Sequence, residues 1–363
     1  MGKKGPVDSR RAKKAVAIWL FMGVGMLVVQ VVLGGLTRLT GSGLSITEWD
    51  PIMGFLPPMN AAEWQKAFEG YQQIAQYKFI NNHYTLSDFK FIFFWEWFHR
   101  LWARLMGVVF LIPFIYFLIK GYFKKSMIFP LIMLFVLGGL QGLVGWIMVQ
   151  SGLNEENVYV SHIRLAVHFM AAMVLIVYTL IFALSLVSKK KDFLERKGML
   201  NFSILIIILL SIQLIYGCFM AGLKAAAFAP TWPDINGKIV PDNLFAKSFI
   251  TNAFYNPLAI HFVHRTLAYV LFIVTVLWWI KARKLDESPI FNRLKNWPLI
   301  LVFLQVILGI ITVLNGDEMG VSTFGLFESF AQLHQLTGML LFLVFIAAAH
   351  YLKETPRKLL QQS

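Results

Sequence analysis

The stretch FFWEWFHRLWARLMG, residues 93–107, directly precedes an uncharged run that extends to Ile119. Among its aromatic side chains stand four ionisable residues: Glu96, His99, Arg100 and Arg104. Ionisable groups at the edge of hydrocarbon are costly, so in a membrane helix they are candidates for function. Glu96 and His99 are three residues apart and therefore share one helical face. The stretch predicts a membrane-spanning helix with a chemical site near one end.

The composition indicates a protein that lies in lipid. Of 363 residues, 58% are hydrophobic and 14% are charged, whereas about a quarter of the residues of a soluble domain are charged. The single cysteine, Cys218, excludes an internal disulfide and a thiolate metal cluster held by this chain alone.

Apolar segments long enough to span a bilayer, about 20 residues, occur eight times in the chain. They cover roughly 15–37, 92–119, 127–150, 160–187, 200–222, 255–280, 297–314 and 328–352. The first is too long for the core of a signal peptide, and we expect it to be retained as a helix. The sequence therefore predicts an all-α integral membrane protein with eight transmembrane helices.

The positive charges alternate between the connections. The two tails and the loops near 120–126, 189–197 and 281–295 hold 22 of the 33 Lys and Arg residues, and the four alternate loops hold seven. By the positive-inside rule, both termini are expected to be cytoplasmic. The net charge of +14 thus reflects membrane topology and does not indicate a nucleic-acid partner.

The long outer loop 38–90 contains a predicted helix over 60–77. Asn60 followed by Glu63 fits a capping box. Trp64, Phe68 and Tyr71 then follow at helical spacing. We expect an amphipathic helix on the outer surface or over the bundle, with an ordinary packed loop helix as the alternative.

The second half of the chain repeats the first. LQGLVGWIMV at 140–149 matches LQVILGIITV at 304–313, and His99-Arg100 matches His264-Arg265 at nearly the same offset. Further matches at an offset of 183 pair Gln30, Gly34, Trp49, Ile52, Gly54 and Pro58 with Gln213, Gly217, Trp232, Ile235, Gly237 and Pro241. We therefore predict two tandem four-helix bundles, 15–187 and 188–352, related as parallel repeats. Basic cytoplasmic tails at 1–14 and 353–363 flank them.

Four of the eight histidines lie at one depth, roughly 10 Å from the outer helix ends: His99, His168, His264 and His334. Each half thus offers two imidazoles on two helices, which fits two haem sites with paired histidine ligands. Hydrogen-bonded packing residues are the alternative. The repeat pairs His261 with Glu96, so His264 is preferred over His261 as a ligand. The remaining histidines are predicted to be structural or peripheral: His83, His162 and His350.

Only the first half carries a carboxylate one turn before its histidine. Glu96 can act as a proton donor or acceptor, or as an anion that stabilises positive charge; a structural salt bridge to Arg100 is the alternative. Arg100, Arg164 and Arg265 are candidates for binding haem propionates or for anchoring helix ends in the headgroups. The glycines near Gly34 and Gly145 permit close helix approach or make room for a flat ligand.

Several motifs closely resemble those of the haem A synthase family, of the mitochondrial and proteobacterial type. They are GGLTRLTGSGLSITEWDPIMGFLPP at 34–58, TLSDFKFIFFWEWFHRLWARLMG at 85–107, HRTLAY at 264–269 and LHQLTG at 333–338. The resemblance implies a membrane monooxygenase that uses O₂ to oxidise the C8 methyl of haem O to the formyl of haem A. It further implies a first half that binds substrate haem and a second half that holds haem b. The residues carried over by motif are His99 and His168 at substrate haem, His264 and His334 at haem b, and Glu96 as the catalytic residue.

The resemblance also sets expectations for partners and location. Some bacterial relatives carry a cysteine pair in the first outer loop, and this chain has none there; the electron donor, a ferredoxin-like protein or a quinol, therefore stays open. We expect a multi-pass protein of the bacterial cytoplasmic membrane, in the lipid bilayer, with haem sites toward the periplasmic side. A haem O synthase that supplies substrate and a homo-oligomeric state are further possibilities.

Two other functions compete with this one. A di-haem b cytochrome that transfers electrons from quinol explains the histidines but gives Glu96 no role. A transporter built on tandem repeats predicts polar residues near the membrane midplane, where these helices have few.

Overall fold

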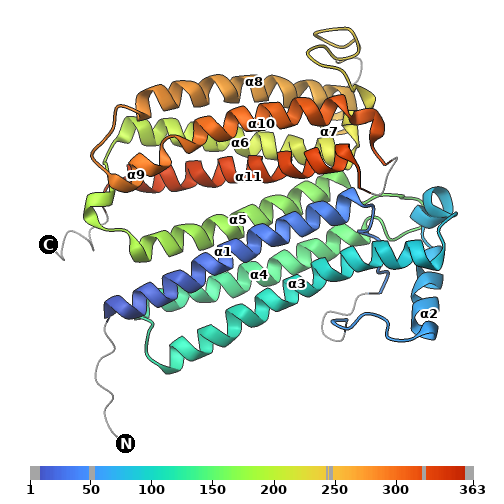
Figure 1. Ribbon diagram of the computed structural model, residues 1–363, viewed down its shortest axis with the longest axis horizontal. Coiled ribbons are helices and arrows are strands. Elements are labelled where there is room, and N and C mark those ends of the chain that lie inside the picture. The colour runs from blue at the N-terminus through green and yellow to red at the C-terminus, as the bar shows by residue number, and fades with distance from the viewer. Residues whose placement is uncertain (1–8, 49–53, 243, 245–247, 321–323, 356–363) are drawn as a thin grey trace, which may run out of the picture. The chain divides into compact units, whose positions relative to one another are not determined.

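The computed structural model describes residues 9–48, 54–242, 244, 248–320 and 324–355. Within these ranges the secondary structure is helical, without a β-strand, and eight segments are long and apolar enough to cross a membrane. The predicted all-α membrane fold is confirmed (Figure 1). The spans are α1 (Ser9–Leu39), α3 (Leu86–Ile119), α4 (Lys125–Gln150), α5 (His162–Val187), α6 (Lys197–Gly222), α8 (Pro257–Ala282), α9 (Pro289–Leu294) with α10 (Trp297–Leu314), and α11 (Leu326–Leu352).

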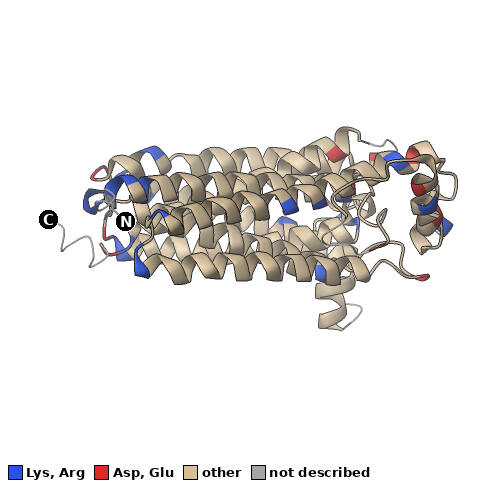
Figure 2. Cartoon of the chain, turned by 90° about the horizontal axis from the view of Figure 1, so that it is seen from below, with Lys and Arg blue, Asp and Glu red and all other residues tan. Residues whose placement is uncertain are grey.

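Charged residues concentrate at the helix ends, and the middles of the helices carry few (Figure 2). This distribution follows from the cost of ionised groups in hydrocarbon. The orientation of the termini and the tandem arrangement stay predictions. Residues 1–8 and 356–363 of the predicted tails, and the repeat positions Trp49 and Ile52, lie outside the described residues.

The chain divides into two compact units, Met1–Ile176 and Val177–Ser363, with the division inside α5. In the first unit, α1 and α3 run antiparallel. Trp19 near the start of α1 donates from Nε1 to the carbonyl of Val109 at 3.1 Å, and Trp102 donates to the carbonyl of Met26 at 3.0 Å. Each indole thus gains a partner that lipid could not supply, and the register of the two helices is set.

The predicted helix in the first outer loop is α2 (Ala61–Gln72). The N-cap is confirmed, because the Asn60 side chain accepts from the Glu63 N–H at 3.0 Å. The reciprocal half of the capping box differs, because Glu63 accepts from the Asn60 side-chain amide at 2.8 Å and from the Met59 N–H at 2.7 Å. The helix ends before residue 77, where the chain enters a π-helical segment, Tyr77–Asn81.

The apolar face of α2 packs on the outer end of α3. Phe68 and Tyr71 are buried against Phe89, with ring centroids 5.2 and 5.3 Å apart, and Trp64 lies edge-on to Phe93 at 5.0 Å. Phe89 and Phe93, in the first two turns of α3, are therefore buried against the loop. The observed α2 is a packed loop helix that covers the end of α3 (Figure 1).

The second unit contains the rest of α5, then α6, η3 (Ala225–Phe228), α7 (Phe249–Tyr255), α8, α9, α10, η4 (Gly316–Glu318) and α11. Its core is built on α11, the most buried of the spans. Trp278 of α8 is fully buried, donates to Ser203 of α6 at 2.8 Å, and lies edge-on to Phe345 of α11 at 5.2 Å. The Trp278 side chain thereby holds α6, α8 and α11 of this unit together.

Candidate functional site

The histidines of each predicted pair come together. In the second unit, the rings of His264 on α8 and His334 on α11 lie edge-on to each other, with centroids 6.3 Å apart and planes at 69°. Two metal–nitrogen bonds of about 2 Å each, plus half of each imidazole, span on the order of 6 Å. In the first unit, His99 on α3 and His168 on α5 lie close enough to interact electrostatically. The spacing therefore suits a metal between two imidazoles, and ligation itself remains a prediction.

Each of these histidines lies against a glutamine and a glycine of a neighbouring helix. The glutamine precedes the glycine by four residues, so the two share a helical face. His99 lies against Gln30 and Gly34 of α1, His168 against Gln141 and Gly145 of α4, His264 against Gln213 and Gly217 of α6, and His334 against Gln305 and Gly309 of α10. The spacing Gln-x-x-x-Gly occurs four times in the sequence. This pattern could have predicted the glutamine and glycine contacts, which the spacing of the histidines does not indicate.

The glutamine amides in the first unit contact both the ring and the backbone of the histidine. Gln30 Nε2 lies 3.3 Å from both ring nitrogens of His99 and donates to the His99 carbonyl at 3.2 Å. Gln141 Nε2 lies 3.2 Å from His168 Nδ1 and donates to the His168 carbonyl at 3.1 Å. One amide therefore links the imidazole to its own helix backbone.

In the second unit, the two histidines contact their glutamines in different ways. Gln213 Nε2 donates to the His264 carbonyl at 3.1 Å and lies 3.3 Å from His264 Nε2. At the other histidine, His334 Nδ1 lies 3.0 Å from the main-chain oxygen of Gln305. A protonated Nδ1 donating to that carbonyl leaves Nε2 with its lone pair, which is the form of histidine that binds a metal.

The residues fit a haem and not a bare metal ion. Among the described residues, no cluster of three or more His, Cys, Asp or Glu side chains could hold a metal. A porphyrin supplies its own four nitrogens, so an axial pair of imidazoles is sufficient. The glycines also matter, because a Cβ at Gly145 or Gly309 would lie 2.8 or 2.9 Å from the imidazole Cε1. The helix faces that carry these glycines therefore leave room for the imidazole rings of the neighbouring helices.

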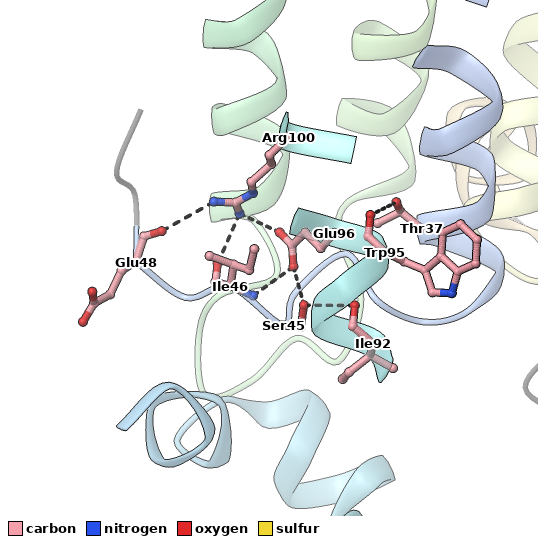
Figure 3. A network of polar contacts seen from close by, with 8 residues as sticks. All are labelled: Thr37, Ser45, Ile46, Glu48, Ile92, Trp95, Glu96 and Arg100. Atoms are coloured by element: carbon pink, nitrogen blue, oxygen red, sulfur yellow. Dashed lines mark hydrogen bonds and ion pairs between the residues drawn. The ribbon is translucent and has the colours of Figure 1, made fainter. Parts of the chain in front are cut away.

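Glu96 lies in a polar network at the outer end of α3, and its carboxylate is 3% exposed (Figure 3). Oε2 accepts from the Ser45 hydroxyl at 2.8 Å and from the Ile46 N–H at 2.9 Å, and Oε1 accepts from Arg100 at 2.6 Å. The salt bridge that the sequence left as an alternative is thus present. Three donors, one of them cationic, thus surround the carboxylate.

In the second unit, His261 occupies the position that corresponds to Glu96. It is 1% exposed, and its Nε2 accepts from Arg265 Nε at 2.9 Å. Arg265 also donates to the carbonyls of Ala229, Thr231 and Asp234 at 3.2, 2.6 and 2.7 Å. Because Nε2 of His261 is engaged by an arginine, the structure favours His264 as the member of the pair, in agreement with the repeat.

The predicted propionate-binding arginines all donate to backbone carbonyls. Arg100 bonds the carbonyl of Ile46 at 3.2 Å, and Arg164 bonds that of Ile147 at 2.9 Å. Beside Arg265, the Gly237 N–H donates to Asp234 at 2.7 Å and holds the pKa of that carboxyl below its ordinary value. These arginines hold outer-loop or helix-end backbone in place, and propionate binding stays a prediction.

The other histidines lie apart from the two pairs. His350 contacts the Ser188 hydroxyl at 3.1 Å near the end of α11, His83 lies edge-on to Tyr84 in the outer loop, and His162 is buried at the first residue of α5.

Eight apolar spans and two pairs of neighbouring histidines, one pair in each unit, define a multi-pass helical membrane protein. The family model COX15-CtaA, described as cytochrome oxidase assembly protein, matches residues 17–347. The chain belongs to this family, which is the heme A synthase family, as its motifs suggested.

Similar relatives span most of the chain. It is 40% identical over 301 residues to heme A synthase of Parvibaculum lavamentivorans, covering 83% of this chain and 86% of the relative. It is 39% identical over 310 residues to heme A synthase of Flavobacterium johnsoniae, covering 84% and 91%. With heme A synthase of Rhodospirillum centenum the identity is 42% over 278 residues, covering 76% and 74%.

Proposed function

We propose that this protein is a haem A synthase, an enzyme that oxidises the C8 methyl of haem O to a formyl group with O₂. The observation that carries the proposal is the difference between two otherwise similar sites. Both units hold a histidine pair seated on glutamine and glycine, but only the first has a buried carboxylate, Glu96, one turn before its histidine. A cytochrome that only transfers electrons does not require a buried carboxylate beside one of its two histidine pairs.

In this proposal His99 and His168 hold the substrate haem, and His264 and His334 hold haem b. When bound, haem b supplies electrons to the reaction. Each of two successive hydroxylations places one oxygen atom of O₂ on the methyl carbon, and two electrons and two protons convert the other atom to water. The resulting gem-diol then loses water to give the formyl group.

Glu96 is proposed to act as a fixed negative charge. Three donors hold its carboxylate in one orientation at a buried position. A preorganised charge in a site of low dielectric stabilises positive charge that develops on an oxidised carbon. The donor network thus serves catalysis by keeping that charge in place.

The enzyme is proposed to lie in a bacterial cytoplasmic membrane. The positive-inside distribution of Lys and Arg supports haem sites toward the periplasmic side of a bacterial cytoplasmic membrane. Electrons are proposed to come from a ferredoxin-like protein or a quinol, and substrate from a haem O synthase.

The test is turnover of haem O by the purified protein. We expect haem A, identified by chromatography and by its pyridine haemochrome spectrum, to form with a reductant and O₂ and to be absent under anaerobic conditions. Intact haem spectra without any formylated product would instead indicate an electron-transferring di-haem b cytochrome.

A further inference from the structure

Two buried atoms of neighbouring side chains in the second unit have no hydrogen-bond partner: Oε1 of Gln213 and Nδ1 of His264. The other end of the same amide is fixed, because Gln213 Nε2 donates to the His264 carbonyl at 3.1 Å. Oε1 of Gln213 is thus a buried acceptor, and Nδ1 of His264 is a buried potential donor. The two side chains contact each other. Leaving buried atoms of this kind without a partner is unfavourable.

At His334 the ring nitrogen Nδ1 has a partner, although Oε1 of Gln305 is unpaired like that of Gln213. His334 Nδ1 lies 3.0 Å from the main-chain oxygen of Gln305. That carbonyl belongs to the backbone of α10 and is present whatever side chain stands at position 305. The two ligands of one proposed haem are therefore oriented by different means, one by backbone and one by a side chain.

We propose that Gln213 is the positioning residue for His264. Rotation of the imidazole about its Cβ–Cγ bond moves Nε2 off the amide nitrogen and lets Nδ1–H approach Oε1 of Gln213. Both orphaned atoms are then satisfied, and the tautomer with a free Nε2 is selected. The inference rests on haem binding in the proposed function.

The glycine on the same face makes the rotation sterically feasible. A Cβ at Gly217 would lie 3.5 Å from His264 Cε1, whereas at the three other sites the corresponding distance is 2.8 to 3.1 Å. The ring of His264 is thus the one least tightly seated on its neighbouring helix. It therefore depends most on the amide for its orientation.

A hydrogen bond from Nδ1–H to an acceptor makes the imidazole a stronger electron donor, which stabilises ferric iron over ferrous iron. Gln213→Leu removes the acceptor at nearly the same volume. We expect this variant to bind the haem of the second unit about 10-fold more weakly and to shift its reduction potential to more positive values. A tenfold change in the ratio of ferric to ferrous stability corresponds to about 59 mV.

Gln305→Leu is the matched control, because it also removes a buried amide beside a ligand of the same haem but leaves the carbonyl that faces His334. We expect its potential to stay near that of the unmodified protein. The relevant haem is identified as the low-spin signal that disappears in His334→Ala, and potentials are measured by redox titration of the purified holoprotein.

Gln213→Glu keeps an acceptor oxygen and covers the case in which the leucine variant does not fold. We expect its potential to lie at or below that of the unmodified protein. Equal shifts in Gln213→Leu and Gln305→Leu, no shift in Gln213→Leu, or a positive shift in Gln213→Glu would each overturn the inference. Absence of any low-spin haem from the unmodified protein would overturn the proposed function as well, so the two failures are distinguishable.

Discussion

The Cε1 atom of His168 lies 2.8 Å from the point where a Cβ on Gly145 would stand. Side chains do not approach so closely, so only glycine permits this position of the imidazole. The same relationship holds between His334 and Gly309 at 2.9 Å and between His99 and Gly34 at 3.1 Å. The glycines of these membrane helices serve the histidines of the neighbouring helices as much as they serve helix packing.

Gly145→Ala should therefore displace His168. The added methyl group has to push the imidazole away from α4, and a ring moved by a few tenths of an ångström no longer faces His99 correctly. We expect at least a tenfold loss of haem affinity at the first site, measured by titrating the purified protein with haem. Gly142→Ala is the control, because its Cβ would meet no atom of the described chain within 4 Å. Equal loss in both variants would contradict the steric argument.

Removal of either histidine of the second pair should abolish the low-spin signal of the haem bound in the second unit. His264→Ala and His334→Ala each leave one axial ligand, and a low-spin haem b requires two strong ligands. The measurement is the optical and electron paramagnetic resonance spectrum of each purified variant. His83→Ala, in the outer loop, should leave both spectra unchanged. Spectra of both variants that are identical to that of the unmodified protein would mean that the ligands are assigned wrongly.

Glu96→Gln should retain haem and lose turnover. The amide keeps an oxygen for Ser45 and Ile46 but removes the charge that faces Arg100. Loss of one preorganised electrostatic group lowers rates about 10²- to 10³-fold, which haem A formation under single-turnover conditions would reveal. Ser45→Ala removes one donor and keeps the charge, so its effect should be much smaller. Undiminished haem A formation by Glu96→Gln would argue against a catalytic carboxylate.

Tyr71→Phe should destabilise the outer loop without affecting the haem sites. The buried phenol donates to Gln76 at 3.0 Å and accepts from Asn81 at 2.8 Å. Its removal leaves two buried polar groups without this partner and costs about 1–3 kcal/mol. A lower thermal midpoint in detergent with unchanged haem content is the expected result. Tyr77→Phe removes a half-buried phenol that accepts from Gln72 and should cost less.

Alkaline pH should weaken the same loop. Burial raises the pKa of Tyr71 above its ordinary value of about 10, although the hydrogen bond from Asn81 partly opposes this rise. The folded protein then holds the proton more tightly than the unfolded chain, so stability is fully present below pH 10 and falls as the pH rises beyond it. The thermal midpoint should decline between pH 9 and pH 11 (about one unit either side of that pKa), and Tyr71→Phe should flatten the decline. An identical decline in this variant would exclude Tyr71 as its cause.

The elements that the sequence predicts correctly are those set by local chemistry. Eight apolar runs become eight spans because a helix satisfies its own backbone hydrogen bonds in lipid. The N-terminus of α2 follows from Asn60 and Glu63, which are only three residues apart. The predicted end of that helix at residue 77 is wrong, because the burial of Tyr71 and its bonds to Gln76 and Asn81 favour a π-helical segment over a continued α-helix.

The sequence by itself determined the membrane-spanning helices, the family and the choice of four histidines at one depth. Only the tertiary structure decided that each histidine faces a glutamine and a glycine, that Glu96 is bound by Ser45, Ile46 and Arg100, and that Arg265 engages His261. Hydrophobic length and capping act over a few residues and can be read in order along the chain. The contacts between the glutamines and the histidines join residues 27 to 69 positions apart, and they exist only once helix packing has fixed which faces meet.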